Sequence, residues 1–113
     1  MRVNFKRDDD ANIDGTSLKG YVHAKYKELE SLFGKPLDSD GFKVSGEWGF
    51  TGEDGSVFRV YDYKQTELYD SELPSVKKFR DSDEVMEFNV GGRYSAVEFL
   101  SWLNEKIRDS RKK

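Results

Sequence analysis

The sequence of 113 residues contains no cysteine, two prolines and a single histidine, His23. The absence of cysteine excludes disulfides, thiolate zinc sites and cysteine nucleophiles. The longest uninterrupted apolar runs are two or three residues, and the N-terminal segment lacks the apolar stretch of a signal peptide. We therefore expect a soluble, cytoplasmic protein with no membrane partner.

The chain also lacks a large excess of one sign of charge, because 22 acidic and 19 basic residues leave a formal net charge of −3. No basic stripe is visible along the chain, which argues against nucleic acid as a partner. What the sequence does contain is aromatic residues, with eight Phe, six Tyr and two Trp. Such residues supply enough burial for one folded core, so we expect a single domain over residues 1–113.

Apolar residues at helical spacing predict a first helix over residues 18–33. Thr16 or Ser17 would cap its start, Gly34 would end it, and His23 would lie on its polar face. The predicted apolar stripe consists of Leu18, Val22, Tyr26, Leu29 and Phe33.

A hairpin and one further strand are expected next. Residues 42–50 and 57–64 read as its two strands, joined through the turn signal Asp54-Gly55. A third strand is predicted over 85–90, followed by a tight turn at Gly91-Gly92. Residues 65–83 are expected to form a long connection with a short strand or turn near Leu68-Tyr69.

A second helix is expected at the C-terminal end, where Ser95 and Glu98 have the spacing of a capping box. Its expected apolar stripe comprises Ala96, Phe99, Leu100, Leu103 and Ile107, with Trp102 at the edge. Residues 108–113 are expected to be a frayed basic tail, and residues 1–14 a flexible or short-strand arm.

Even-numbered residues are the more apolar ones in all three predicted strands, for example Trp48, Val60 and Phe88. Because side chains alternate between the two faces of a strand, these residues would lie under the helices. The expected fold is α+β, a two-layer sandwich. It would have an antiparallel sheet of three to four strands and two helices on one face, in the order α-β-β-β-α.

The odd-numbered residues would then form an open, polar sheet face that carries tyrosines. Tyrosine combines a large contact area with a hydrogen-bonding group at low entropic cost, so we interpret this face as a binding surface. Its candidate binding residues are Lys43, Glu47, Arg59, Tyr61, Tyr63 and Asn89.

Catalytic chemistry finds little support in the sequence. With one histidine and no nucleophile-elbow spacing, no Ser-His-Asp arrangement is apparent, and we expect a protein that is not an enzyme and needs no cofactor. Asp10, Asn12, Asp14 and Gly15 match the first half of a calcium loop, but Tyr21 occupies the position of its bidentate glutamate. We interpret this segment as an acidic turn and expect no metal site.

A small anionic ligand is the alternative to a macromolecular partner. Free N–H groups at a helix start attract phosphate, and an adjacent arginine would add positive charge. Aromatic rings nearby could stack the base of a nucleotide-like signal. The residues of this possible site are Trp48, Lys64, Gly91, Gly92 and Arg93.

The order of several short motifs resembles that of a family of small bacteriophage-encoded proteins. The shared pieces are Gly20-Tyr21-Val22 with Tyr26 and Leu29, Phe33-Gly34-Lys35-Pro36, Lys43, Glu47-Trp48, Asp54-Gly55, Tyr61-Asp62-Tyr63-Lys64 and Val90-Gly91-Gly92. Family members carry a histidine where Asn89 stands here. The resemblance implies a viral accessory protein acting in the cytoplasm of a bacterial host, and it carries over no activity.

These observations lead to one expected function and two alternatives. The first is a non-catalytic phage protein that binds and inhibits a host macromolecule, as a host-takeover or anti-defence factor, with a host protein as the partner. The second is a protein that sequesters a nucleotide-like ligand. The third is a structural or oligomerising component of the virion or of its assembly.

Overall fold

The computed structural model describes residues 3–37, 44, 46–63, 66 and 68–112. These residues form five strands and three helices in the order β-β-α-β-β-α-β-α. The strands are β1 (Phe5–Arg7), β2 (Ser17–Ala24), β3 (Glu47–Gly52), β4 (Val57–Tyr61) and β5 (Met86–Gly92). The helices are α1 (Tyr26–Phe33), α2 (Val76–Asp81) and α3 (Val97–Ser110). None of the described helices has the length and hydropathy needed to cross a bilayer.

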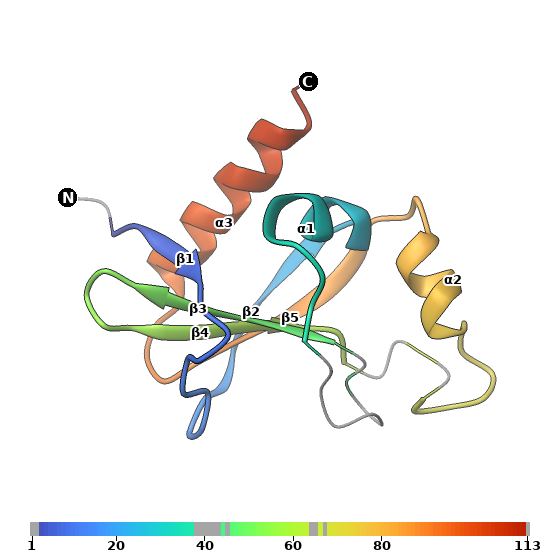
Figure 1. Ribbon diagram of the computed structural model, residues 1–113, viewed down its shortest axis with the longest axis horizontal. Coiled ribbons are helices and arrows are strands. Elements are labelled where there is room, and N and C mark those ends of the chain that lie inside the picture. Colours follow the sequence, from blue (N-terminus) through green and yellow to red (C-terminus); the bar gives the residue numbers. More distant parts are fainter. Residues whose placement is uncertain (1–2, 38–43, 45, 64–65, 67, 113) are drawn as a thin grey trace.

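All five strands join one antiparallel sheet in the order β1-β3-β4-β5-β2. The helices lie on one side of this sheet (Figure 1). The expected α+β class with an antiparallel sheet is therefore confirmed. The expected strand count and element order differ from those observed, because β2 was taken as part of a helix, α2 was not expected, and β1 was foreseen only as a possible short strand.

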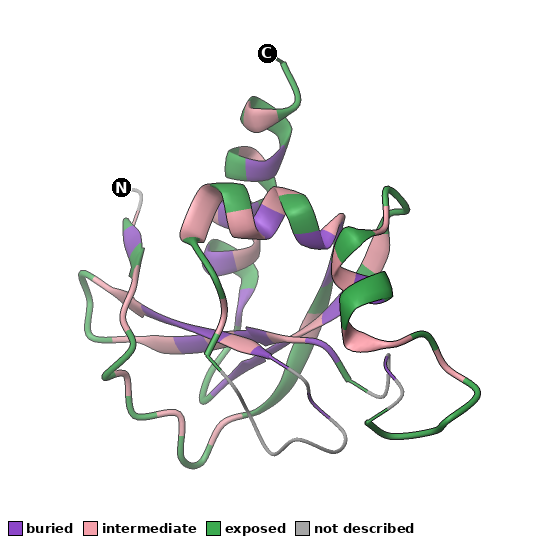
Figure 2. Ribbon diagram, turned by 45° about the vertical axis from the view of Figure 1, so that its right-hand side comes forward, coloured by how far each residue is buried: buried purple, intermediate pink, exposed green. Residues whose placement is uncertain are grey.

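The core lies between the sheet and helices α1 and α3, where buried positions of the strands face buried positions of the helices (Figure 2). The alternation predicted for the strands is confirmed. Even-numbered residues of β3, β4 and β5 are at most 4% exposed from Trp48 to Val90, apart from the half-buried Gly52 and Met86. The buried even-numbered side chains are Trp48, Phe50, Phe58, Val60, Phe88 and Val90.

Aromatic packing dominates this core. The rings of Phe58 and Phe99 stack with centroids 4.7 Å apart, and Phe50 packs against Phe99 at 5.2 Å. Ring pairs in such geometries add roughly 0.5–1.5 kcal/mol beyond the burial of their area. The predicted stripe on the last helix is confirmed here, since Phe99, Leu103 and Ile107 are all buried on α3.

The predicted helix over residues 18–33 is wrong in its first half. Residues Ser17–Ala24 form β2, and α1 begins only at Tyr26, after an extended Lys25 with ψ 143°. Val22 and Ala24 are fully buried whereas Tyr21 and His23 are exposed, which is the two-residue period of a strand. Residue 22 fits both periods, and the β-branched Val22 beside the aromatic Tyr21 favours the strand.

The end of α1 is confirmed, because Gly34 adopts φ +85° and its N–H donates to the carbonyl of Glu30 at 2.7 Å. A left-handed residue of this kind commonly ends a helix and is usually glycine. The predicted caps at Thr16 and Ser17 are wrong. The Thr16 hydroxyl donates to the carbonyl of Ile13 at 2.7 Å, before the start of β2.

The hairpin is confirmed, with β3 and β4 joined through Asp54 and Gly55. Gly55 takes φ +84°, and the Asp54 carboxylate accepts the N–H of Ser56 at 3.0 Å. The predicted turn near residues 68–69 is also present, since the N–H of Tyr69 donates to Thr66 at 3.0 Å. The rest of the expected connection contains α2, which Ser75 caps by accepting from Lys78 N–H at 3.1 Å.

The C-terminal end differs from prediction at two points. The N-cap of α3 is Ala96, with no side-chain capping bond, so the predicted capping box from Ser95 to Glu98 is wrong. The segment predicted to be a frayed tail begins within a helix, because α3 continues to Ser110. Arg111 then donates to the Glu28 carboxylate on α1 at 2.6 and 2.9 Å.

The segment between β1 and β2 must cross the sheet, since these two strands form its opposite edges. It crosses the face opposite the helices, called the outer face below (Figure 1). A Cβ added at Gly49 would lie 2.9 Å from the Asp8 carbonyl oxygen and 3.6 Å from Ala11 Cβ. The crossing segment therefore covers the outer face at Gly49.

Candidate binding surface on the outer sheet face

One row of outward-facing side chains runs across four strands. The pairing register places Glu47 opposite Tyr61, Tyr61 opposite Asn89, and Asn89 opposite Tyr21. Directly opposed residues in antiparallel strands have Cβ atoms roughly 4.5–5.5 Å apart on the same face. The sheet thus brings together three predicted binding residues and one residue that was not predicted.

The neighbouring row extends this surface. His23 on β2 lies opposite Glu87 on β5, with His23 Nε2 3.2 Å from Glu87 Oε2. Tyr63 follows β4 and places its ring at right angles to that of Tyr61, with centroids 6.5 Å apart. We refer to these six residues as the tyrosine patch: Tyr21, His23, Tyr61, Tyr63, Glu87 and Asn89.

The patch presents aromatic side chains to solvent. Tyr21 is 47% exposed and Tyr63 is 38% exposed, while Tyr61 and Asn89 are half-buried between them. Single exposed apolar residues are ordinary, but exposed aromatics gathered on one sheet face are typical of an interaction surface. Geometry of this kind can provide contact area and hydrogen bonds to a partner.

An ion pair holds one side of the patch in place. Arg59 Nη2 lies 2.8 Å from Glu47 Oε2, with the two side chains only 20% and 15% exposed. The same guanidinium sits 3.9 Å from the ring centroid of Tyr61. These predicted residues therefore form a support beneath Tyr61, because their charged groups are mostly occupied with each other and with its ring.

The residues predicted for a nucleotide-like ligand do not come together on this face. Trp48 is 1% exposed and points into the core, where its indole N–H donates to the carbonyl of Gly34 at 2.8 Å. It lies on the opposite sheet face from Tyr61 and Tyr63. Lys43 and Lys64, predicted for binding, fall outside the described residues.

Gly91 and Gly92 continue β5 instead of forming the predicted tight turn. Both pair with β4 on one side and β2 on the other, and α3 starts only at Val97. Lack of space for a side chain accounts for glycine at position 92, since a Cβ there would lie 2.7 Å from the ring of Phe58. The predicted anion site at a helix start is therefore not formed by this pair.

Arg93 anchors the crossing segment to the sheet. Its guanidinium donates to the carbonyl oxygens of Asn12 and Asp14, the latter at 3.1 Å from Nε. The positively charged Arg93 side chain therefore binds two carbonyl oxygens of the acidic turn whose sequence matches the first half of a calcium loop. The described residues contain no cluster of three or more histidine or acidic side chains placed to hold a metal ion.

Tyr21, His23 and Glu87 are the patch residues that were not among the predicted binding residues. Tyr21 and His23 were assigned to a helix, and that assignment removed them from the sheet. The signal that could have found them is the alternation of Tyr21 and His23 with Val22 and Ala24, which is a strand pattern. His23 and Glu87 remain 63% and 51% exposed, so their pairing is a solvated one.

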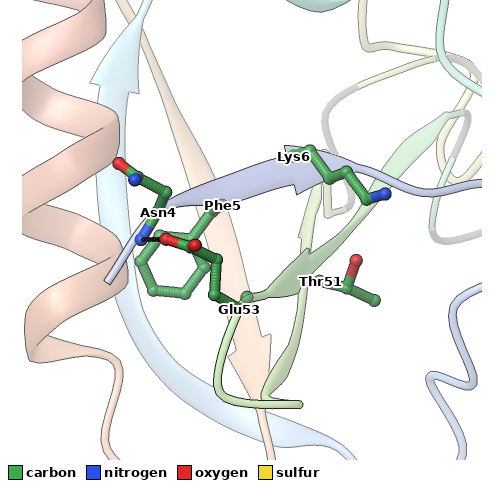
Figure 3. Close-up of a pocket in the computed structure, with 6 residues that line it drawn as sticks. Asn4, Phe5, Lys6, Thr51 and Glu53 are labelled. Atoms are coloured by element: carbon green, nitrogen blue, oxygen red, sulfur yellow. Dashed lines mark hydrogen bonds between the residues drawn. The ribbon is translucent and has the colours of Figure 1, made fainter. Parts of the chain in front are cut away.

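A separate hollow of about 340 Å³ lies at the other edge of the sheet, beside β1 and the hairpin. Figure 3 shows the Asn4 N–H bonded to the Glu53 carboxylate, at 3.1 Å, next to the ring of Phe5. Lys6 and Thr51 extend away from that ring (Figure 3). Convergent polar groups, which mark a ligand site, are not gathered among these labelled residues.

Comparison with known proteins adds no family to this geometry. No family model and no curated protein matches the chain.

Proposed function

We propose that this protein is a non-catalytic binding protein that recognises a host protein through the tyrosine patch and inhibits it. The bacteriophage setting implied by the motif order makes a bacterial protein the partner and the bacterial cytoplasm the place of action. The observation that carries the proposal is the row of Tyr61, Asn89 and Tyr21 across three neighbouring strands, with Tyr63 beside it.

Preorganisation supports a binding role for these rings. Tyr61 is held between the Arg59 guanidinium and the ring of Tyr63, so it loses little conformational freedom when a partner covers it. Tyrosine is enriched among the residues that dominate protein interfaces. The patch lies on a sheet face, whose area suits a macromolecule better than a small ligand.

A nucleotide-like ligand receives less support from the same residues. Trp48 packs in the core and Arg93 binds backbone carbonyl groups, so neither is available beside Tyr61. Gly91 and Gly92 lie within a strand rather than at a helix start. For these reasons we place the protein partner first.

Capture from bacterial lysate tests the proposal with a matched pair of variants. The patch variant combines Tyr21→Ser with Tyr63→Ser, and the control variant combines Tyr69→Ser with Tyr94→Ser. All four tyrosines are exposed, at 47%, 38%, 37% and 79% respectively, so neither pair of changes should disturb the core. Equal melting curves for the two variants would confirm that both are folded.

We expect the wild type and the control variant to capture the same bacterial protein. The patch variant should bind it at least about tenfold more weakly, since central interface tyrosines each contribute on the order of 1–2 kcal/mol. If no bacterial protein is captured, or if the patch variant captures it equally well, the proposed function is wrong.

A further inference from the structure

Strand β2 forms an open edge of the sheet over eight residues (Figure 1). Among the described residues, β5 is its only strand partner. An edge strand presents a row of backbone N–H and C=O groups that another extended chain can pair with. The other edge, β1, spans only three residues and offers much less backbone.

The two faces of β2 differ in a way that suits an added strand. Val22 and Ala24 are fully buried beneath the helical layer, so the inner face is already supported. On the outer face, Leu18 and Tyr21 are 46% and 47% exposed. A strand laid along the edge would bring its own side chains against these two residues and continue the row of the tyrosine patch.

Charge indicates what kind of strand this would be. Residues 15–27 contain Lys19, Lys25 and Lys27 and no acidic residue, and they are the longest acid-free stretch of a chain with 22 acidic groups. Two acidic side chains near β2 already have basic partners. Glu87 on β5 pairs with His23, and Asp83, in the segment before β5, lies 3.1 Å from Lys27. Lys19 is exposed at the edge. Opposite charges on adjacent strands stabilise pairing, so an acidic strand is favoured.

A second copy of this chain fits the edge less well. Register is irregular between Leu18 and Gly20, which leaves Gly20–Ala24 as the regular part of β2. A two-fold antiparallel pair centred on Val22 would bring Lys19 of each copy near Lys25 of the other, at the two ends of this regular part. Like charges directly opposite one another destabilise a strand pair.

We propose that β2 binds an extended, acidic segment of the partner protein as a sixth strand of the sheet. This proposal rests on the proposed function and specifies how the partner is recognised. Backbone pairing along β2 supplies affinity, while Lys19, Leu18 and Tyr21 select acidic and apolar side chains on the added strand.

Backbone amide NMR tests this mode with two synthetic peptides as probes. One peptide alternates valine with glutamate, and its control alternates valine with lysine. We expect the glutamate peptide to shift the β2 amides and slow their hydrogen exchange, and the lysine peptide to bind at least about fivefold more weakly. Equal binding of the two peptides, or shifts confined to other elements, would overturn the proposal.

Charge reversal at the edge supplies a second test. Lys19→Glu should weaken binding of the glutamate peptide about threefold to tenfold and strengthen binding of the lysine peptide. The control Lys112→Glu makes the same charge change at the C-terminal end and should change neither affinity. A free protein that is dimeric with protected β2 amides would also overturn the proposal. Capture of a bacterial protein without protection of β2 defeats only the strand mode, whereas the absence of any captured protein defeats the proposed function itself.

Discussion

Replacement of Arg111 tests whether the chain end is a tail or part of the fold. Arg111 makes two hydrogen bonds to the Glu28 carboxylate, at 2.6 and 2.9 Å, and so connects the end of α3 to the start of α1. The same carboxylate accepts the N–H of Lys25 at 2.8 Å. The Glu28 side chain is 14% exposed and that of Arg111 is 47% exposed, which places the pair between a surface and a buried ion pair.

We expect Arg111→Gln to lower the free energy of unfolding by about 1 kcal/mol at neutral pH. Exposed pairs contribute roughly 0.2–1 kcal/mol and bidentate charged hydrogen bonds somewhat more, and solvent screening at Arg111 limits the gain. For a chain of this length, about 1 kcal/mol corresponds to a melting temperature lower by roughly 4 °C. Thermal unfolding measures this shift in melting temperature, and Lys112→Gln is the control because it removes a neighbouring positive charge.

The pH dependence of this difference has a definite sign. The Arg111 guanidinium lowers the pKa of Glu28 below its ordinary value of 4.5, although burial opposes the shift. A carboxyl group with a lowered pKa in the folded state stabilises the fold above its unfolded pKa and loses that contribution as the pH falls through the folded value. The gap between wild type and Arg111→Gln should therefore close below pH 4.5. Equal stability of Arg111→Gln and Lys112→Gln at neutral pH would refute the reasoning.

Three further substitutions test the packing around the end of β5. Gly92→Ala should lower the free energy of unfolding by about 1–3 kcal/mol in chemical denaturation, because its Cβ would lie 2.7 Å from the buried Phe58 ring. A Cβ at Gly91 would lie 3.0 Å from the Arg59 stem and 3.6 Å from the Ser17 carbonyl oxygen, so Gly91→Ala should cost less. A larger loss at Gly91 would contradict this account. Arg93→Ala should speed amide exchange in residues 8–16 with little change in global stability, since it removes the bonds to that segment. Unchanged exchange there would show that the crossing segment is held by other contacts.

Burial periodicity made part of this fold predictable. The hairpin signal at Asp54-Gly55 and the alternation around Trp48 and Phe88 depend on local chemistry, and both are confirmed. The same is true of the stop at Gly34, where a positive φ is needed. Local signals of this kind are not overridden when every neighbouring element agrees with them.

Two of the wrong assignments share a cause, because tertiary packing decided between two local structures that the sequence allowed. Val22 and Tyr26 satisfy a helical stripe, yet Val22 belongs to a strand that pairs with β5 along its length. The pair Gly91-Gly92 is typical of a turn, yet here it continues β5. Its lack of side chains leaves room for Phe58 and Arg59 of the neighbouring strand β4. Neither pairing partner is near in sequence, so local patterns could not reveal them.

The candidate surface was predictable in its centre and not at its rim. Tyr61, Tyr63 and Asn89 follow from strand alternation alone. Tyr21 and His23 depend on β2 joining β5, a pairing between residues far apart in the sequence. The register then placed the missed residues beside the predicted ones, and this juxtaposition is what gives the tyrosine patch its extent.

Hydrogen exchange of the complex with the captured bacterial protein tests the central claim most directly. The claim is that the outer face, from β4 through β5 to the edge of β2, contacts the partner. We predict that protection on binding appears at β2 and around Tyr61, Tyr63 and Asn89, and is absent from the exposed face of α3. Protection confined to α3, or to the hollow beside Phe5 and Glu53, with unchanged exchange at β2 and Tyr61, would contradict it.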